Sequence, residues 1–178
     1  MVIDSSAGFG EALNHLSALG HRDFAFIGGP RDIPSAEMVR RQVETALDSC
    51  RLRLSCSLEC NYKIDGGWSA VRTLVAQKRL VSAILCGNDL IALGAIRALE
   101  QMGVDVPSQV SVVGHVDLLI ARLARPPLTT IHVSSDQIGR LAFQRLASLA
   151  AAPGSHGGKV AVETRLVIRK STAPARQA

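Results

Sequence analysis

Short apolar runs alternate with amphipathic stretches along most of this 178-residue chain, and that alternation constrains the fold more than any single motif does. Residues 24–29 (FAFIGG), 80–85 (LVSAIL) and 109–117 (QVSVVGHVD) are typical of buried β-strands. Between them, residues 35–50 and 67–78 repeat apolar side chains at the spacing of helices with one buried face. The pattern predicts an α/β fold in which a parallel sheet is covered by helices on both faces.

The same pattern extends toward both ends of the chain. We expect helices at residues 12–20 and 135–151, and further strands at 57–64 and 160–170. Hydrophobic residues make up 47% of the chain but aromatic residues only 3%. The core is therefore expected to consist of aliphatic side chains, which suits helices packed on a sheet.

At residues 85–99 (LCGNDLIALGAIRAL) a strand passes directly into a helix, and Asn88 and Asp89 stand at the junction. Either residue type accepts hydrogen bonds from the free N–H groups that begin a helix. We expect Asp89 to form this cap and Asn88 to face outward. Parallel strands share one carboxyl edge, where open α/β sheets bind ligands, so Gly28–Gly29, Asn88 and His115–Asp117 should meet there. A simple turn without a binding role would use the same residues.

The charge, cysteine and motif patterns argue against several functional classes. The net charge of +5 is spread along the chain without a basic cluster for nucleic acid. The four cysteines form no CxxC pair and no metal-ligand spacing, which favours reduced thiols in a cytoplasmic protein. No phosphate-binding glycine loop or nucleophile elbow is present, so we expect no enzyme, no cofactor and no metal. We find no signal peptide and no apolar run of about 18 residues for a membrane.

Three segments carry a specific resemblance. HLSALGHRDFAFIGGP, CGNDLIALGAIRALEQMGVDVPSQVSVVGHVD and PPLTTIHV…IGRLAF, in this order, resemble the effector-binding core of LacI/GalR-family transcription regulators. The resemblance extends over residues 8–170. It implies a periplasmic-binding-protein-like fold with a ligand held between two α/β lobes. Full-length relatives add a helix-turn-helix domain that binds operator DNA as a dimer.

The resemblance also implies a division of the chain into parts of two lobes. Residues 20–131 and the returning strand 159–170 correspond to one complete C-terminal lobe. Residues 1–19 correspond to a remnant of the N-terminal lobe, and 132–158 to a crossover helix of that lobe. The tail, residues 171–178, is expected to be disordered. The chain is thus expected to be truncated, lacking the DNA-binding headpiece and most of one lobe.

Four residues fall where the family places ligand contacts. Trp68, in DGGWSA, matches the aromatic ring that packs flat on the ligand, although a tryptophan at a helix start can equally cover the core. Asn88 matches a polar residue that donates and accepts hydrogen bonds. Asp117 stands among the acids after the third strand, and Ser135 stands near the return crossover.

Two residues depart from the family pattern. Val39 replaces a ligand-binding arginine, and Val116 replaces a carboxylate that would take sugar hydroxyls. Buried charges are costly unless they are paired, so their loss indicates a changed site. The effector is then either less polar than a sugar, or no longer bound.

The resemblance further implies a homodimer, a small-molecule effector and no membrane partner. Without a recognition helix, the chain alone is not expected to bind operator DNA. The alternative is an interaction subunit, or a degenerate remnant, that dimerises and binds no small ligand. The candidate interface residues are Leu93, Ile96, Arg97, Leu118 and Leu119.

Overall fold

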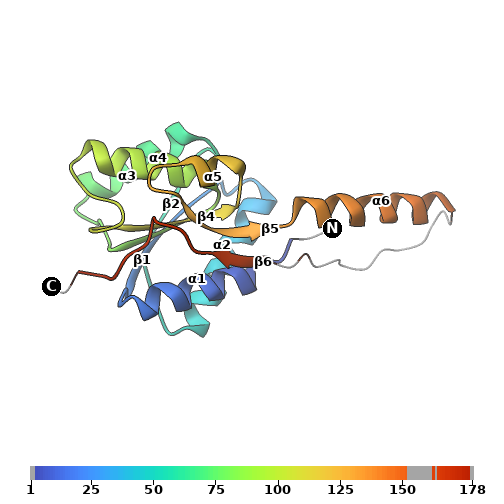
Figure 1. The fold of residues 1–178 in the computed structure, drawn as a ribbon, viewed down its shortest axis with the longest axis horizontal. Helices are drawn as coiled ribbons and strands as arrows, with labels where there is room; N and C mark the ends of the chain where they lie inside the picture. The colour runs from blue at the N-terminus through green and yellow to red at the C-terminus, as the bar shows by residue number, and fades with distance from the viewer. Residues whose placement is uncertain (1–2, 152–161, 163, 177–178) are drawn as a thin grey trace.

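The computed structural model describes residues 3–151, 162 and 164–176. Within them a six-stranded sheet forms the centre of the fold, with strand order β2-β1-β3-β4-β5-β6 (Figure 1). Strands β1 to β5 are parallel, whereas β6 runs antiparallel to β5. The strands are β1 (Asp23–Gly28), β2 (Arg53–Glu59), β3 (Ala83–Cys86), β4 (Ser111–Val116), β5 (Thr129–Val133) and β6 (Thr164–Val167).

Helices cover both faces of the sheet, with α3 and α4 on one face and α1 and α2 on the other (Figure 1). Strand β1 shows why, because its successive side chains point to opposite faces. Ala25 and Ile27 join the cluster under α3 and α4, while Phe24 and Phe26 join the cluster under α1 and α2. The helices are α1 (Ser6–Ala18), α2 (Pro34–Ser49), α3 (Ile64–Ala76), α4 (Asp89–Gln101), α5 (Leu119–Leu123) and α6 (Ser135–Ala151).

This architecture confirms the predicted α/β fold with helices on both faces, and it corrects the expectation of a purely parallel sheet. The exception is β6, within the expected returning segment 159–170, whose residues Thr164–Val167 pair antiparallel with Val133–Thr130. An antiparallel strand at one edge is common on otherwise parallel sheets.

The assignment of residues 1–19 to a separate remnant is wrong for α1. Phe9, Leu13 and Leu16 on this helix are fully buried. They pack in one cluster with Phe24 of β1 and Ile131 of β5. The apolar face of α1 thus completes the core of this lobe rather than that of another.

The expected disorder of the tail is also wrong for residues 171–176. The Ser171 hydroxyl donates to the carbonyl of Val112 over 2.6 Å and accepts from the Thr129 amide over 2.8 Å. The amide of Ala175 donates to the carbonyl of Leu19 over 2.7 Å. These bonds hold the segment against β4, β5 and the end of α1; residues 177–178 lie outside the described part.

Helix α6 extends away from the sheet (Figure 1), and none of its residues is buried. Its membership of a neighbouring lobe, predicted for residues 132–158, stays a prediction, and the boundary between 158 and 159 lies outside the described residues. Across the described ranges, no helix is both long and apolar enough to cross a membrane.

Candidate functional site

The carboxyl ends of the parallel strands form one edge of the sheet, and Asn88 stands on it directly after β3. Its side chain is the N-cap of α4, because Oδ1 accepts from the amide of Ile91 over 2.8 Å. Its Nδ2 donates to the carbonyl of Tyr62 over 3.2 Å. The expectation that Asp89 is the cap and Asn88 is free is therefore wrong. Asn88 caps the helix and also fixes the loop that follows β2.

Tyr62 is the aromatic residue that the structure brings to Asn88, and sequence reasoning missed it. Strand β2 ends at Glu59, so Tyr62 lies in the loop at the carboxyl edge rather than inside a strand. Its half-buried ring packs beside Gly29, where any side chain would overlap it. Burial and the neighbouring Cys60 raise the pKa of the Tyr62 phenol, while the nearby positive charge of Arg40 opposes this. Tyr62 thus supplies a flat ring and a neutral hydroxyl at the edge.

Trp68 lies inside α3 rather than in the loops at the strand ends, and the ligand contact expected for it stays a prediction. Helix α3 begins at Ile64, three residues earlier than expected, so Trp68 lies inside the helix. Its indole N–H donates to Gln101 Oε1 over 2.7 Å, at the far end of α4 and about three helical turns from Asn88. The guanidinium of Arg72 lies over the indole, 4.5 Å from its centroid.

A groove of about 670 Å³ lies between α3 and α4, and Trp68 forms part of its wall. Ile64 and Leu90 contribute apolar surface, and the exposed Arg97 lines it as well. The ring of Trp68 therefore lines a groove in the helical layer that reaches from Lys63 and Leu90, at the starts of α3 and α4, to Gln101 at the end of α4.

Asp89, the residue after Asn88, is fully buried and faces the neighbouring strands instead of solvent. Its Oδ1 accepts from the hydroxyl of Thr130 over 2.5 Å, and its Oδ2 accepts from the amide of Leu118 over 2.6 Å. Burial, with a smaller contribution from nearby Asp117, raises the pKa of Asp89 to about 6, although both hydrogen bonds and Arg169 act to lower it. The carboxylate joins α4, β5 and the start of α5.

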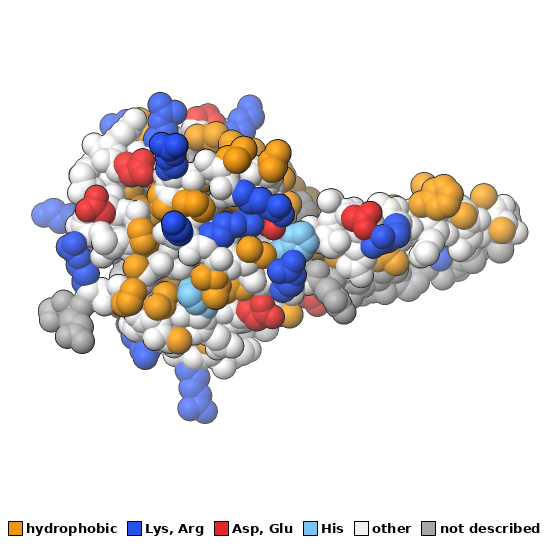
Figure 2. Space-filling view, viewed as in Figure 1, with side chains coloured by type: hydrophobic (Ala, Val, Ile, Leu, Met, Phe, Trp, Pro, Cys, Tyr) orange, Lys and Arg blue, Asp and Glu red, His pale blue; other side chains and the backbone are white. Residues whose placement is uncertain are grey.

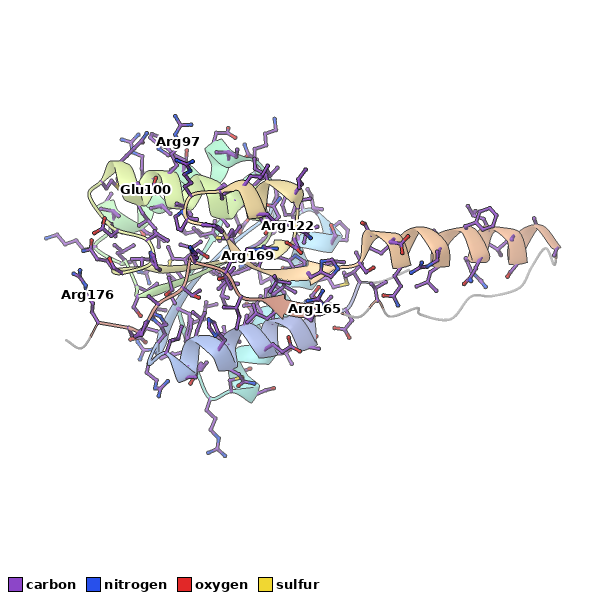
Figure 3. All side chains as sticks on the ribbon, in the orientation of Figure 1. Arg97, Glu100, Arg122, Arg165, Arg169 and Arg176 are labelled. Carbon is purple, nitrogen blue, oxygen red and sulfur yellow. The ribbon has the colours of Figure 1, made fainter. Side chains whose placement is uncertain are left out.

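Asp117 is occupied by ion pairs rather than open to a ligand. Its side chain is 3% exposed, and its Oδ1 lies 2.6 Å from Nη2 of Arg169. Its Oδ2 lies 3.0 Å from Nδ1 of His132 and 3.7 Å from Nη2 of Arg122. Figure 3 shows Arg122 and Arg169 next to each other on this side of the molecule. The ligand contact that the family resemblance implies for Asp117 stays a prediction, and in this structure the carboxylate is paired with three basic side chains.

The other residues expected at the site are scattered. Ser135 is exposed at the first position of α6, and Val39 packs against the core under α2. Val116 is half-buried at the end of β4. Arg40 is buried: its guanidinium lies over the ring of Phe26, 5.6 Å from the centroid, and donates to the hydroxyl of Ser57. A buried cation thus stands one position after Val39.

His115 on β4 forms a neutral, buried contact near the same edge. Its Nδ1 donates to the carbonyl of Gly87 over 3.2 Å, so its Nε2 accepts from the hydroxyl of Ser5 over 2.8 Å. Its ring stacks on Phe9 with the centroids 5.3 Å apart. Burial lowers the pKa of His115 to about 4. The residue holds the start of α1 against the sheet.

A second candidate site is an exposed apolar surface on α5. Leu119 and Leu123 are 71% and 72% exposed, and Leu118 and Ile120 are exposed beside them. We call these four residues the association face. Figure 2 shows hydrophobic side chains gathered over this helix next to arginines.

The remaining interface candidates differ in exposure. Arg97 is exposed and Leu93 is half-buried, but Ile96 is only 3% exposed and belongs to the core under α4. Ile96 was therefore wrongly assigned, because the buried stripe of α4 is wider than its spacing suggested. The described residues include no group of three or more His, Cys, Asp or Glu side chains that could hold a metal ion.

Comparison with known proteins identifies what this geometry resembles. Residues 13–172 match the periplasmic binding protein-like domain. The lactose operon repressor of Klebsiella pneumoniae is 33% identical over 171 residues, covering 96% of this chain and 48% of the repressor. The transcriptional repressor PurR of Histophilus somni (strain 129Pt) is 32% identical over 162 residues, covering 90% of this chain and 49% of the repressor. The chain spans about half the length of these curated relatives.

Solved structures give the same result. A dimeric lac repressor with a C-terminal deletion superposes with a TM-score of 0.90 at 28% identity, covering 97% of this chain and 63% of that one. A complex of the transcriptional regulator CelR with cellobiose superposes with a TM-score of 0.87 at 29% identity, covering 95% of this chain and 52% of that one. The chain belongs to the periplasmic binding protein-like domain family, and the relatives it resembles in sequence and structure are transcriptional repressors and regulators.

Proposed function

We propose that this chain is the ligand-sensing and dimerising core of a LacI-type transcriptional regulator. The observation that carries the proposal is the position of the Tyr62 ring, which packs beside Gly29 at the carboxyl edge, in a loop that Asn88 holds through the Tyr62 backbone carbonyl. A half-buried tyrosine offers an apolar face and a hydroxyl, the combination that recognises a small hydroxylated molecule. A regulator of transcription works where the DNA is, so the proposal carries a cytoplasmic location with it.

The ligand class follows from the side chains at the edge. CelR was solved with cellobiose, a sugar. In this chain Val39 and Val116 supply no charge, and Asp117 is already paired with Arg169. We propose an effector that is sugar-like in size and less polar than a free sugar, stacked on Tyr62.

Calorimetric titration of a panel of hexoses, disaccharides, nucleosides and purine bases tests this assignment. Tyr62→Ala should weaken the binding of the best ligand by about 2 kcal/mol, as expected for an aromatic anchor. Tyr62 is the better test residue, because replacing Asn88 would also remove the cap of α4. Trp68→Phe is the matched control and should leave the affinity unchanged. An equal loss of affinity in both variants would show that the ligand does not bind at the sheet edge.

We propose a second copy of this chain as the partner of the association face. Four exposed apolar side chains on one short helix favour association, and a structure that superposes on the chain is a dimer. Light scattering should give a dimer for the unaltered chain and a monomer for Leu119→Lys. Phe143→Lys, which replaces an equally exposed apolar residue on α6, is the control. A monomer at tens of micromolar for the unaltered chain would contradict the proposal.

The alternative, an interaction subunit that binds no small ligand, is favoured by one observation. Val39 and Val116 lack the charges that a sugar site would use, and the Asp117 carboxylate is committed to Arg169. A chain that dimerises normally but binds nothing in the titration panel would support this alternative over ligand sensing.

A further inference from the structure

The backbone turns sharply between β4 and α5. Val116 has φ of 104° and Asp117 has φ of 61°, both in the left-handed region that favours glycine. A β-branched residue in this region is strained, and such backbone persists only where the surroundings hold it. We call residues 116–118 the corner.

Polar contacts to two carboxylates, those of Asp89 and Asp117, hold the corner, and His132 and Arg122 pair with Asp117 as well as Arg169 does. On the Leu118 side, the carboxylate of buried Asp89 accepts from the amide of Leu118 over 2.6 Å and from the hydroxyl of Thr130 over 2.5 Å. The Asp89 carboxylate thus binds Leu118, the residue that follows the two strained ones, and links it to Thr130 of β5. A hydrogen bond from an N–H to a charged carboxylate is among the stronger ones in proteins.

On the other side, Arg169 holds the carboxylate of Asp117. Its Nη2 lies 2.6 Å from Asp117 Oδ1, and its Nη1 donates to the carbonyl of Leu128 over 2.8 Å. The side chain of Arg169 is 14% exposed, so the pair is largely shielded from solvent. The guanidinium therefore links the corner to the segments that flank β5 and β6.

The corner leads directly into α5. Leu118 is its N-cap residue, and Leu119 begins the helix. The helix has only five residues, too few to set its own orientation through packing. Ala121 is the only buried residue of α5, and its carbonyl accepts from the Leu128 amide over 2.8 Å; the corner is the covalent attachment at the other end of the helix.

We infer that Asp89 and Asp117, together with Arg169, are positioning residues that fix the association face, and that neither carboxylate contacts the effector. The Asp89–Leu118 hydrogen bond and the Asp117–Arg169 ion pair clamp the strained corner at two successive residues, and so set the direction in which Leu119 and Leu123 point. The inference rests on the proposed function in one respect, the assignment of α5 to self-association.

A purely structural contribution to stability would give a different result. It would lower the stability of the whole lobe without changing the affinity between two folded copies. Positioning lowers that affinity even among molecules that remain folded. A control of matched stability separates the two, and Leu47→Ala provides it, because Leu47 is buried under α2 on the opposite face of the sheet.

The variants are Asp89→Ala and Asp89→Asn. Alanine removes both hydrogen bonds, whereas the asparagine Oδ1 can still accept from Leu118 while its Nδ2 donates to Thr130. We expect Asp89→Ala to speed hydrogen exchange of the Leu118 amide, and to raise the dimer dissociation constant, each by about tenfold. Asparagine should restore both to within about threefold, and Leu47→Ala should leave both unchanged.

Hydrogen exchange read by NMR and sedimentation equilibrium give independent outcomes. Unchanged exchange at Leu118 in Asp89→Ala would overturn the clamp whatever the oligomeric state. Faster exchange with an unchanged dissociation constant would show that the clamp does not serve the association face. An unaltered chain that stays monomeric contradicts the proposed association instead, and the exchange rates would still decide the clamp.

Discussion

Asp117 and Arg169 form a largely buried ion pair, with 2.6 Å between carboxylate Oδ1 and guanidinium Nη2. Sequence comparison places Asp117 among ligand contacts, but the fold uses its charge internally. Arg169 comes 52 residues later, after β6 has returned to the edge of the sheet. The pair therefore exists only once the last strand has docked.

Removing Arg169 should destabilise the protein strongly. Arg169→Ala leaves the Asp117 carboxylate buried with a weaker set of partners, and an uncompensated buried charge costs about 3 kcal/mol or more. Arg165→Ala removes an exposed arginine from the neighbouring strand and should cost less than about 0.5 kcal/mol. Urea unfolding measures both free energies. Equal losses of unfolding free energy in the two variants would show that the Asp117–Arg169 pair stabilises the fold no more than an exposed arginine does.

The pH dependence of stability should reveal Asp89. Its pKa of about 6 in the folded state lies above the usual 3.8. The folded state then binds this proton more tightly, so the contribution of Asp89 is greatest below pH 3.8 and is lost as the pH rises through 6. Asparagine does not titrate, so Asp89→Asn removes this pH-dependent contribution to the stability. Its stability relative to the unaltered chain should therefore rise by about 2 kcal/mol or slightly more between pH 4 and 7.5. A difference that is constant across this range would contradict the raised pKa.

The ionisation of His115 should change the stability in the opposite direction, over an overlapping range of pH. Its pKa of about 4 in the folded state lies below the usual 6.5. The unfolded state binds this proton more tightly, so stability is lost as the pH falls from 6.5 toward 4. His115→Gln should remove a loss on the order of 3 kcal/mol over that interval. Unfolding curves at several pH values check this, and an acid loss as large in His115→Gln as in the unaltered chain would refute it.

Close packing of α3 on α4 should depend on a glycine. A Cβ at Gly67 would overlap the backbone of Ile91, and that backbone cannot give way as a side chain can. Gly67→Ala should therefore cost about 2 kcal/mol or more. Gly139→Ala in α6, where nothing lies within 4 Å of the new atom, should stabilise by about 0.5–1 kcal/mol. Thermal unfolding compares the two variants, and a neutral Gly67→Ala would contradict the packing described.

Much of the fold could be predicted from local patterns. Strands β1, β3 and β4 are apolar runs, and helices α2 and α4 carry the spacing of one buried face, so their places follow from the chain itself. Helix α3, expected to begin at Gly67, begins at Ile64, so Gly66 and Gly67 both lie inside it although glycine disfavours a helix. The contact with α4 explains Gly67, and that contact is not local.

The candidate site could be predicted only in part. Asn88 and Asp89 are both good caps, and the choice between them depends on Thr130 and Leu118, far along the chain. Because β2 was expected to extend to residue 64, Tyr62 was assigned to a strand instead of to the loop at the sheet edge. Because α3 was expected to begin at residue 67, Trp68 was placed at the start of a helix instead of inside it. Contacts between distant segments, rather than residue preferences, decided each of these outcomes.

The most direct test uses the single tyrosine and the single tryptophan of the chain. Isotope labelling of both rings gives one set of tyrosine signals from Tyr62 and one indole signal from Trp68, which can be followed together in a ligand titration. We predict that a sugar-like or purine-like effector shifts the Tyr62 signals saturably and leaves the Trp68 indole unmoved. A saturable shift at Trp68 alone, or no shift at Tyr62 with any ligand of the panel, would contradict an effector site at the sheet edge.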